Sequence, residues 1–315
     1  MPTITVSELH NAIYAYLPNI MRIANIQDNK LNKKIDAYIS QIISLHPDTT
    51  ITRLHSMFSM INAASKENVF YQNLLSYYDE QAKILYENIC QGNKIWQNKV
   101  GVKLKQSILD ISDQNIADPS NPAFLNYMAE ILYAATIIPR AQEGGYEFLG
   151  FDVLMNNGKD ADLQFRRIKD GVLIYFDNLS IHGVDVSKVN KSSDLYNFLK
   201  DRVDKKLDIK TAGLTSQKGC YIINNNVSEF YVAPILWSET CDLLPYKKAF
   251  QSFARNKNLS CLFVALQPQR LPTGEYHFSI ETIENILLRW KKQECVIMKL
   301  VNNVRTFFAA KKRIK

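Results

Sequence analysis

Acidic residues at three positions of the sequence fall in segments that otherwise favour burial. Glu130 is the single acidic residue of the apolar run 123–135, where a carboxylate is costly to bury without a partner or a metal ion. Asp162 and Asp177 fall in two segments with strand propensity, in which acidic residues are unfavourable. One helical carboxylate and two carboxylates on adjacent strands can converge on a hard divalent cation. We therefore predict that these three side chains bind Mg²⁺ or Mn²⁺, an ion that activates water and stabilises charge in phosphodiester hydrolysis.

A β-hairpin is predicted to place the two aspartates on neighbouring strands. The Asp-Gly turn at 170–171 separates segment 161–165 from segment 172–181, and such a turn between two β-prone runs indicates a hairpin. Side chains alternate between the faces of a strand. The side chains of Asp162 and Asp177 therefore each point to one face of their strand. We expect both side chains to approach Glu130.

The order of these elements resembles that of the PD-(D/E)XK nuclease superfamily, which has the restriction-endonuclease-like fold. That pattern is a helix with a glutamate, a strand ending near Pro-Asp, a hairpin, and a strand carrying Glu-X-Lys, followed by a helix and further strands. Glu130 resembles the helical glutamate. Segment 159–163 is similar to the Pro-Asp position with Asp162 as its aspartate, and segment 175–179 is similar to the Glu-X-Lys strand with Asp177 as its acid.

The resemblance spans roughly residues 121–236, about a third of the chain, because helix 194–207 and strand 220–224 stand where the pattern has its next elements. It implies a metal-dependent nuclease, or a nuclease-derived nucleic-acid-binding protein. The expected fold is α+β or α/β, with a helical N-terminal region followed by a mixed β-sheet core flanked by helices.

Leu179 departs from the pattern, because the superfamily has a lysine there. The resemblance implies that this lysine positions or activates the attacking water, and a leucine can do neither. Ala161 also stands in place of the proline. In one hypothesis a lysine from elsewhere fills the space, with Lys205 as our candidate and Lys206 or Lys159 as alternatives. In the other hypothesis the site is inactive and the fold serves binding or scaffolding.

The elements that must position these residues divide the chain in two. Apolar residues recur at helical spacing through residues 1–118, and no catalytic constellation stands among them. Two prolines within 118–122 break any helix, so we place a domain boundary there. We predict a helical domain, 1–118, and a mixed α/β domain, 119–315. The second is expected to contain further strands at 216–227, 229–236 and 259–266, a turn at 272–274, and helices at 246–255 and 281–293.

Charge is distributed unevenly between the two parts. Residues 1–118 hold 11 Lys/Arg and 11 Asp/Glu, so the net charge of +7 belongs entirely to residues 119–315. The last thirty residues hold nine basic groups against Glu294, with Phe307 and Phe308 beside them. Basic and aromatic residues together are typical of nucleic-acid contact. We expect nucleic acid as a partner of this basic C-terminal region, unless it is simply a solvated helix face and tail.

The remaining composition narrows the classes of protein. No run approaches the ~20 apolar residues of a membrane helix, no secretory signal opens the chain, and the five cysteines are widely spread. We therefore expect a cytoplasmic protein without a membrane span, a disulfide framework or a zinc site. The alternative to a nuclease is a non-enzymatic interaction or scaffold protein that docks a protein partner through its helical N-terminal part.

Overall fold

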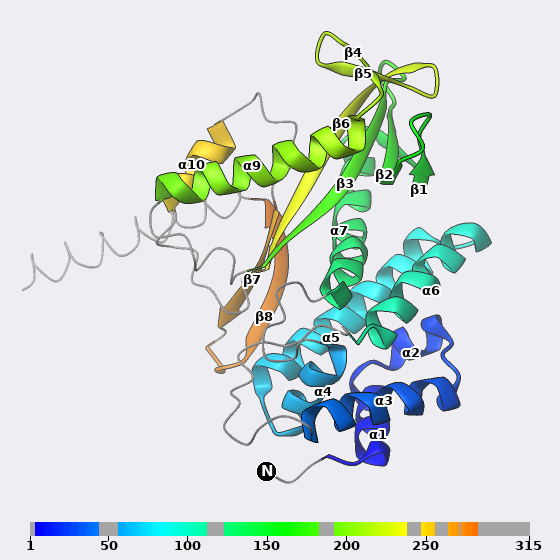
Figure 1. The fold of residues 1–315 in the computed structure, drawn as a ribbon, viewed down its shortest axis with the longest axis vertical. Coiled ribbons are helices and arrows are strands. Elements are labelled where there is room, and N and C mark those ends of the chain that lie inside the picture. Colours follow the sequence, from blue (N-terminus) through cyan, green and yellow to red (C-terminus); the bar gives the residue numbers. More distant parts are fainter. Residues whose placement is uncertain are drawn as a thin grey trace, which may run out of the picture.

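The computed structural model of the protein describes residues 4–43, 56–111, 123–182, 192–237, 247–255, 264–270 and 272–282. Within these segments the chain has a mixed α/β fold, as the sequence predicts at this coarse level. A group of N-terminal helices packs at one end of a twisted, mixed β-sheet (Figure 1). No helix in the described segments is both long and apolar enough to cross a membrane.

The N-terminal region is helical throughout its described part. Local caps define several of its helices: Thr5 and Glu8 form a capping box at the start of α1, and Asn68 and Asn93 cap α5 and α6. A π-helical turn follows α5 directly. The elements are α1 (Val6–Tyr16), α2 (Pro18–Ala24), α3 (Asp28–Ile43), α4 (Met57–Ser65), α5 (Val69–Ile84), the π-helical turn η1 (Leu85–Ile89) and α6 (Lys94–Leu109).

The sheet begins with the predicted hairpin. The elements after the N-terminal helices are α7 (Ala123–Glu143), β1 (Tyr146–Leu154), β2 (Asp160–Arg167), β3 (Leu173–His182), α9 (Ser192–Thr211), β4 (Thr215–Gln217), β5 (Cys220–Ile223), β6 (Asn226–Trp237), α10 (Lys247–Arg255), β7 (Val264–Arg270) and β8 (Tyr276–Thr282). Strands β1, β2 and β3 form an antiparallel meander, and β3 then pairs in parallel with β6. The long β6 pairs with β5 near its start and in parallel with β7 near its end, and β8 is antiparallel to β7.

Helices cover both faces of the sheet. Helix α7 packs with Leu163, Phe165 and Ile174 in the main hydrophobic core, whereas α9 places Val203 against Tyr175 in a smaller core. Because β3 and β6 are parallel, a crossover must connect them, and the described α9 lies in that connection (Figure 1). The two faces of the sheet therefore belong to different hydrophobic cores.

The main core does not stop at the predicted domain boundary. It contains buried residues from α1 to α6 together with residues of α7 and the sheet. For example, Trp96 of α6 lies 4.7 Å from Phe148 of β1 between ring centroids, and Phe70 of α5 lies 5.0 Å from Phe278 of β8. The boundary itself, 118–122, lies outside the described residues. The division into two domains remains a prediction.

The sequence placed the C-terminal elements less well. The turn at 272–274 is present, with Gly274 at a φ of 89°. The chain continues into β8, which runs to Thr282, so the helix predicted to begin at residue 281 does not begin there. The rest of that helix and the basic C-terminal region lie beyond the described residues.

Candidate metal centre

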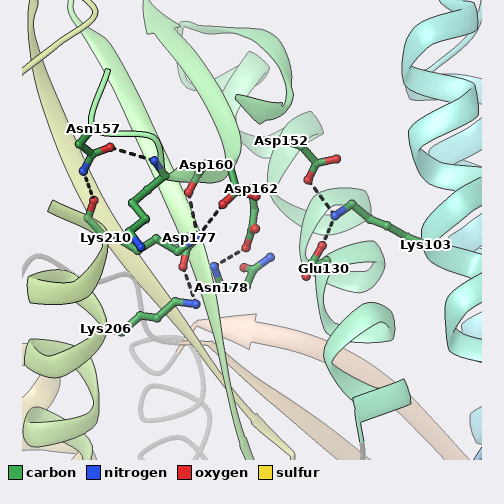
Figure 2. Close-up of polar contacts among 11 residues, drawn as sticks. Lys103, Glu130, Asp152, Asn157, Asp160, Asp162, Asp177, Asn178, Lys206 and Lys210 are labelled. Carbon is green, nitrogen blue, oxygen red and sulfur yellow. Dashed lines mark hydrogen bonds and ion pairs between the residues drawn. The ribbon is translucent and has the colours of Figure 1, made fainter. Parts of the chain in front are cut away.

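Three carboxylates from three elements meet beside the N-terminal half of α7. Glu130 comes from α7, Asp152 from β1 and Asp162 from β2. One ligand oxygen of each lies within 4.8 Å of the others. Figure 2 shows these side chains converging between the sheet and α6. We call this group the acidic cluster; it joins two residues that the sequence singled out with one that it did not.

Helix α6 supplies the cations of the cluster. The Lys103 Nζ lies 2.8 Å from Asp152 Oδ1 and forms a second ion pair with Glu130 (Figure 2). One turn earlier on the helix, the Lys99 ammonium donates to the backbone carbonyl oxygens of Phe151 and Asp152. The N-terminal helices therefore contribute directly to the site, although the sequence indicated no chemistry in them.

An irregularity in β1 brings Asp152 into the cluster. Its backbone is left-handed, with a φ of 48°, a conformation that aspartate tolerates better than most residues. The neighbours Phe151 and Val153 pair with Leu163 and Ala161 of β2. Residues two apart in a strand normally share a face. Here Leu163 belongs to the main core, whereas Ala161 belongs to the smaller core on the other face. Strict alternation of faces thus fails at this point of the hairpin.

The two aspartates that the sequence placed together have different partners. Asp162 turns toward α7, whereas Asp177 turns toward α9 and is fully buried. Its two oxygens lie 2.7 and 2.8 Å from the ammonium groups of Lys206 and Lys210 (Figure 2). Of the predicted triad, Glu130 and Asp162 meet in the acidic cluster, whereas Asp177 lies outside that group and forms ion pairs with two lysines of α9.

The lysine candidates also lie elsewhere. Lys205 forms an ion pair of 2.9 Å with Asp201 on the outer surface of α9, and its side chain is 70% exposed. Lys206 binds Asp177, and Lys159 is exposed. None of the three joins the acidic cluster, where Lys103 is the ammonium group instead.

Asn178, not the predicted Asp177, is the residue of β3 that lies beside the acidic cluster. Its backbone N–H donates to Asp162 Oδ2 at 2.6 Å. Its side chain is 8% exposed and points toward Glu130, and neither amide atom has a hydrogen-bond partner among the described residues (Figure 2). It lines a small cavity of about 10 Å³ with Lys103, Glu130 and Asp162, which is close to the volume that one water molecule needs. Alternation along β3 puts Asn178 on the face opposite to Asp177, but the sequence did not indicate which of the two faces meets Glu130.

Burial and charge repulsion set the protonation of the cluster. Burial raises the pKa of Asp162 well above its ordinary value, and Glu130 and Asp177 raise it further. Burial also raises the pKa of Glu130, against the opposing effect of Lys103. Burial lowers the pKa of Lys103, but Glu130 and Asp152 outweigh it and raise that pKa overall. One ammonium group thus offsets part of the charge of three carboxyl groups, and the arrangement favours a further cation or a proton.

The donor set fits a hard divalent cation. Mg²⁺ and Mn²⁺ prefer carboxylate, carbonyl and water oxygens, and the cluster offers three carboxylates and the free amide of Asn178 within a confined space. The cluster also fits a network that needs no ion, since Lys103 already pairs with two of the carboxylates. No protein-family model, curated protein or solved structure matches the chain.

Proposed function

We propose that the protein is a divalent-cation-dependent phosphodiesterase acting on nucleic acid, with a core of the PD-(D/E)XK type. The order α7, β1, β2, β3, α9 and β6, with the short β4 and β5 before β6, resembles the order of elements in that superfamily, and the helical glutamate and the β2 aspartate lie in the acidic cluster. The observation that carries the proposal is the convergence of three carboxylates on one another, next to a small cavity lined by the buried, unpaired amide of Asn178.

Each residue has a defined role in this proposal. Glu130, Asp152 and Asp162 hold Mg²⁺ or Mn²⁺, which supplies a Lewis acid for the phosphate and lowers the pKa of a bound water. The unpaired Asn178 amide lines the cavity with Glu130 and Asp162, and its carbonyl oxygen is available to the cation or to a water bound to it. Lys103 replaces the lysine that is missing at Leu179, and its ammonium group stabilises negative charge on the phosphate. In this proposal Asp177 and Lys205 take no part in catalysis.

A second function follows from the ion pairs of Lys103. Because this ammonium group already binds Glu130 and Asp152, the cluster can be an ion-pair network that fixes α6 against the sheet. The protein would then be an inactive nuclease-like scaffold whose helical part binds a protein partner. The phosphodiesterase requires a bound cation and cleavage of nucleic acid, whereas the ion-pair network requires neither.

The deciding experiment is calorimetric titration of MnCl₂, run beside a nicking assay on supercoiled plasmid. The variants are Asp152→Asn and Asp162→Asn, which keep the side-chain volume. Asp201→Asn is the matched control, because Asp201 is an exposed aspartate on α9. We expect the wild type and the control to bind Mn²⁺ and nick the plasmid, and both cluster variants to lose binding and activity.

Other outcomes distinguish the proposals. Binding without nicking would support a cation-binding scaffold and contradict the phosphodiesterase. Absence of Mn²⁺ binding in the wild type would contradict both the metal centre and the enzyme, and would leave the ion-pair network as the role of the cluster.

A further inference from the structure

A larger pocket opens between the C-terminal half of α7 and the sheet. Its volume is about 360 Å³, which lies within the range of small-molecule sites. Ile137 and Ala141 of α7 form one wall, and Phe165 and Phe176 of β2 and β3 form the opposite wall. We call it the α7–sheet pocket.

The aromatic side chains of this pocket present flat surfaces. Phe176 and Tyr231 are stacked, with ring centroids 5.5 Å apart and an angle of 25° between their planes. Phe165 meets Phe176 edge to face at 5.7 Å. Flat aromatic walls opposite aliphatic residues favour a planar ring, because stacking adds to the gain from burying apolar area.

The polar side chains of the pocket leave one positive charge unbalanced. Arg167 lies 3.0 Å from Glu229, whose other oxygen accepts a hydrogen bond from the Tyr231 hydroxyl at 2.8 Å. Arg167 also pairs with Asp170 at 2.9 Å. In contrast, Arg140 is exposed at the pocket and has no ion pair or hydrogen bond from its side chain to any described residue. The guanidinium of Arg140 is therefore available to an anionic group.

The pocket is distinct from the acidic cluster, although both lie on the α7 face of the sheet. Tyr133 stands on α7 between Glu130 and Ile137, and its buried ring packs against Phe176 at 6.3 Å between centroids. The two sites share no lining residue.

We propose that the α7–sheet pocket binds a small planar aromatic molecule carrying one anionic group. The ring lies between Ala141 and the stacked pair of Phe176 and Tyr231, and the anionic group binds Arg140. This binding does not depend on cation binding or catalysis at the acidic cluster.

Two fluorescent probes test the proposal on the full chain. 8-Anilinonaphthalene-1-sulfonate has both planar rings and an anionic group, whereas N-phenyl-1-naphthylamine has the same rings without the charge. We expect the sulfonate to bind at one site per chain and more tightly than the uncharged probe. Arg140→Gln should weaken the sulfonate about tenfold, as expected for loss of a charge-assisted hydrogen bond, and should leave the uncharged probe unchanged.

A filling variant and a control locate the site. Ala141→Trp, at a half-buried position of the pocket wall, should abolish the binding of both probes while the circular dichroism spectrum stays that of the wild type. Arg166→Gln is the matched control, because this exposed arginine on β2 does not line the pocket, and it should bind both probes like the wild type. Sulfonate binding that survives Ala141→Trp, or that is unaffected by Arg140→Gln, would overturn the proposal.

Discussion

Lys103 is the residue that most affects the charge balance of the acidic cluster. Its ammonium group pairs with two carboxylates whose side chains are 21% and 28% exposed, and its own side chain is 16% exposed. An ammonium group and a bound divalent cation would neutralise the same carboxylates. Removing the lysine should therefore have opposite consequences in the absence and in the presence of a cation.

Lys103→Met should lower the free energy of unfolding by about 2 kcal/mol without metal, because it leaves two mostly buried carboxylates unpaired. This cost is smaller than that of breaking a fully buried ion pair, because both carboxylates are partly exposed. If the cluster is a metal centre, MnCl₂ should recover most of this loss. Chemical denaturation with and without MnCl₂ measures both effects.

The control for this change is Lys205→Met, which removes an exposed ion pair of α9. It should change stability by no more than about 0.5 kcal/mol, with no response to MnCl₂. Recovery by MnCl₂ in the control as well, or in neither variant, would contradict a metal centre at Lys103.

Asp177 provides a second comparison at the residue scale. It is fully buried between Lys206 and Lys210. Asp177→Asn should cost about 3 kcal/mol, because it leaves two ammonium groups against a neutral amide. Manganese affinity of the folded variant should stay that of the wild type. A folded variant that binds Mn²⁺ less tightly would restore Asp177 as a ligand and contradict the separation of the two faces.

At the scale of elements, α2 depends on α5 for its N-terminus. Helix α2 has no side-chain cap of its own at Leu17. Instead, the buried Asp79 of α5 accepts hydrogen bonds from the backbone N–H of Ile20 at 2.8 Å and from the Asn19 amide at 2.7 Å. A carboxylate at a helix N-terminus also interacts favourably with the helix dipole. The hydrogen bond joins α2 to α5 through two residues, Ile20 and Asp79, that are 59 positions apart in the sequence.

Asp79→Ala should lower the free energy of unfolding by about 2 kcal/mol, since it removes a helix cap and leaves a buried N–H without a partner. Urea denaturation gives the value. The matched control is Asp36→Ala on α3, an exposed position, where a change within about 0.5 kcal/mol is expected. Equal effects in the two variants would show that the cap contributes nothing.

The same residue gives a pH dependence. Burial raises the pKa of Asp79 above its ordinary 3.8, against the lowering effect of the hydrogen bonds from Ile20 and Asn19, and Glu80 raises it further. The folded chain therefore binds this proton more tightly than the unfolded chain. The contribution of Asp79 to stability is largest below 3.8 and falls as the pH rises through the folded pKa.

The variant Asp79→Asn cannot titrate, so the difference in unfolding free energy between the wild type and this variant should shrink as the pH rises from about 4 to about 7. Denaturation at several pH values measures it. A difference that grows with pH would show that the pKa is lowered instead.

At the scale of the whole molecule, the helices and the sheet share one hydrophobic core. That core contains α7 residues that are buried on nearly all sides, such as Phe124, Met128 and Leu132. Lys103, which pairs with the acidic cluster, and Lys99, which binds the backbone at Asp152, both come from the N-terminal helices. Stability and the candidate site therefore both depend on the contact between the two parts.

The full chain should unfold in one cooperative transition, and residues 119–315 alone should not fold stably, because α7 would expose its apolar surface to water. Thermal denaturation of the full chain and limited proteolysis of the fragment test this. Two separate transitions, or a protease-resistant fragment 119–315, would support the two independent domains that the sequence predicts.

Sequence patterns determined much of the fold because the patterns are local. The Asp-Gly turn and its two flanking runs predicted β2 and β3, and the spacing of apolar residues predicted the N-terminal helices. Helix α9 and strand β5 were also placed close to their observed bounds. Strand β8 was missed, although Tyr276, Phe278 and Ile280 alternate with polar residues as they do in a strand.

The candidate site was also only partly predictable from local sequence patterns. The sequence by itself singled out Glu130, because it is a lone carboxylate in an apolar run, and Asp162, because of its place in the predicted hairpin. Only the tertiary structure decided their partners: the left-handed backbone of Asp152 brings in a third carboxylate, and the packing of α6 on β1 brings in Lys103. It also assigned Asp177 to α9 and turned Asn178 to the cluster. A strand pattern gives the alternation of side chains, but not where a bulge reverses it or which distant helix covers each face.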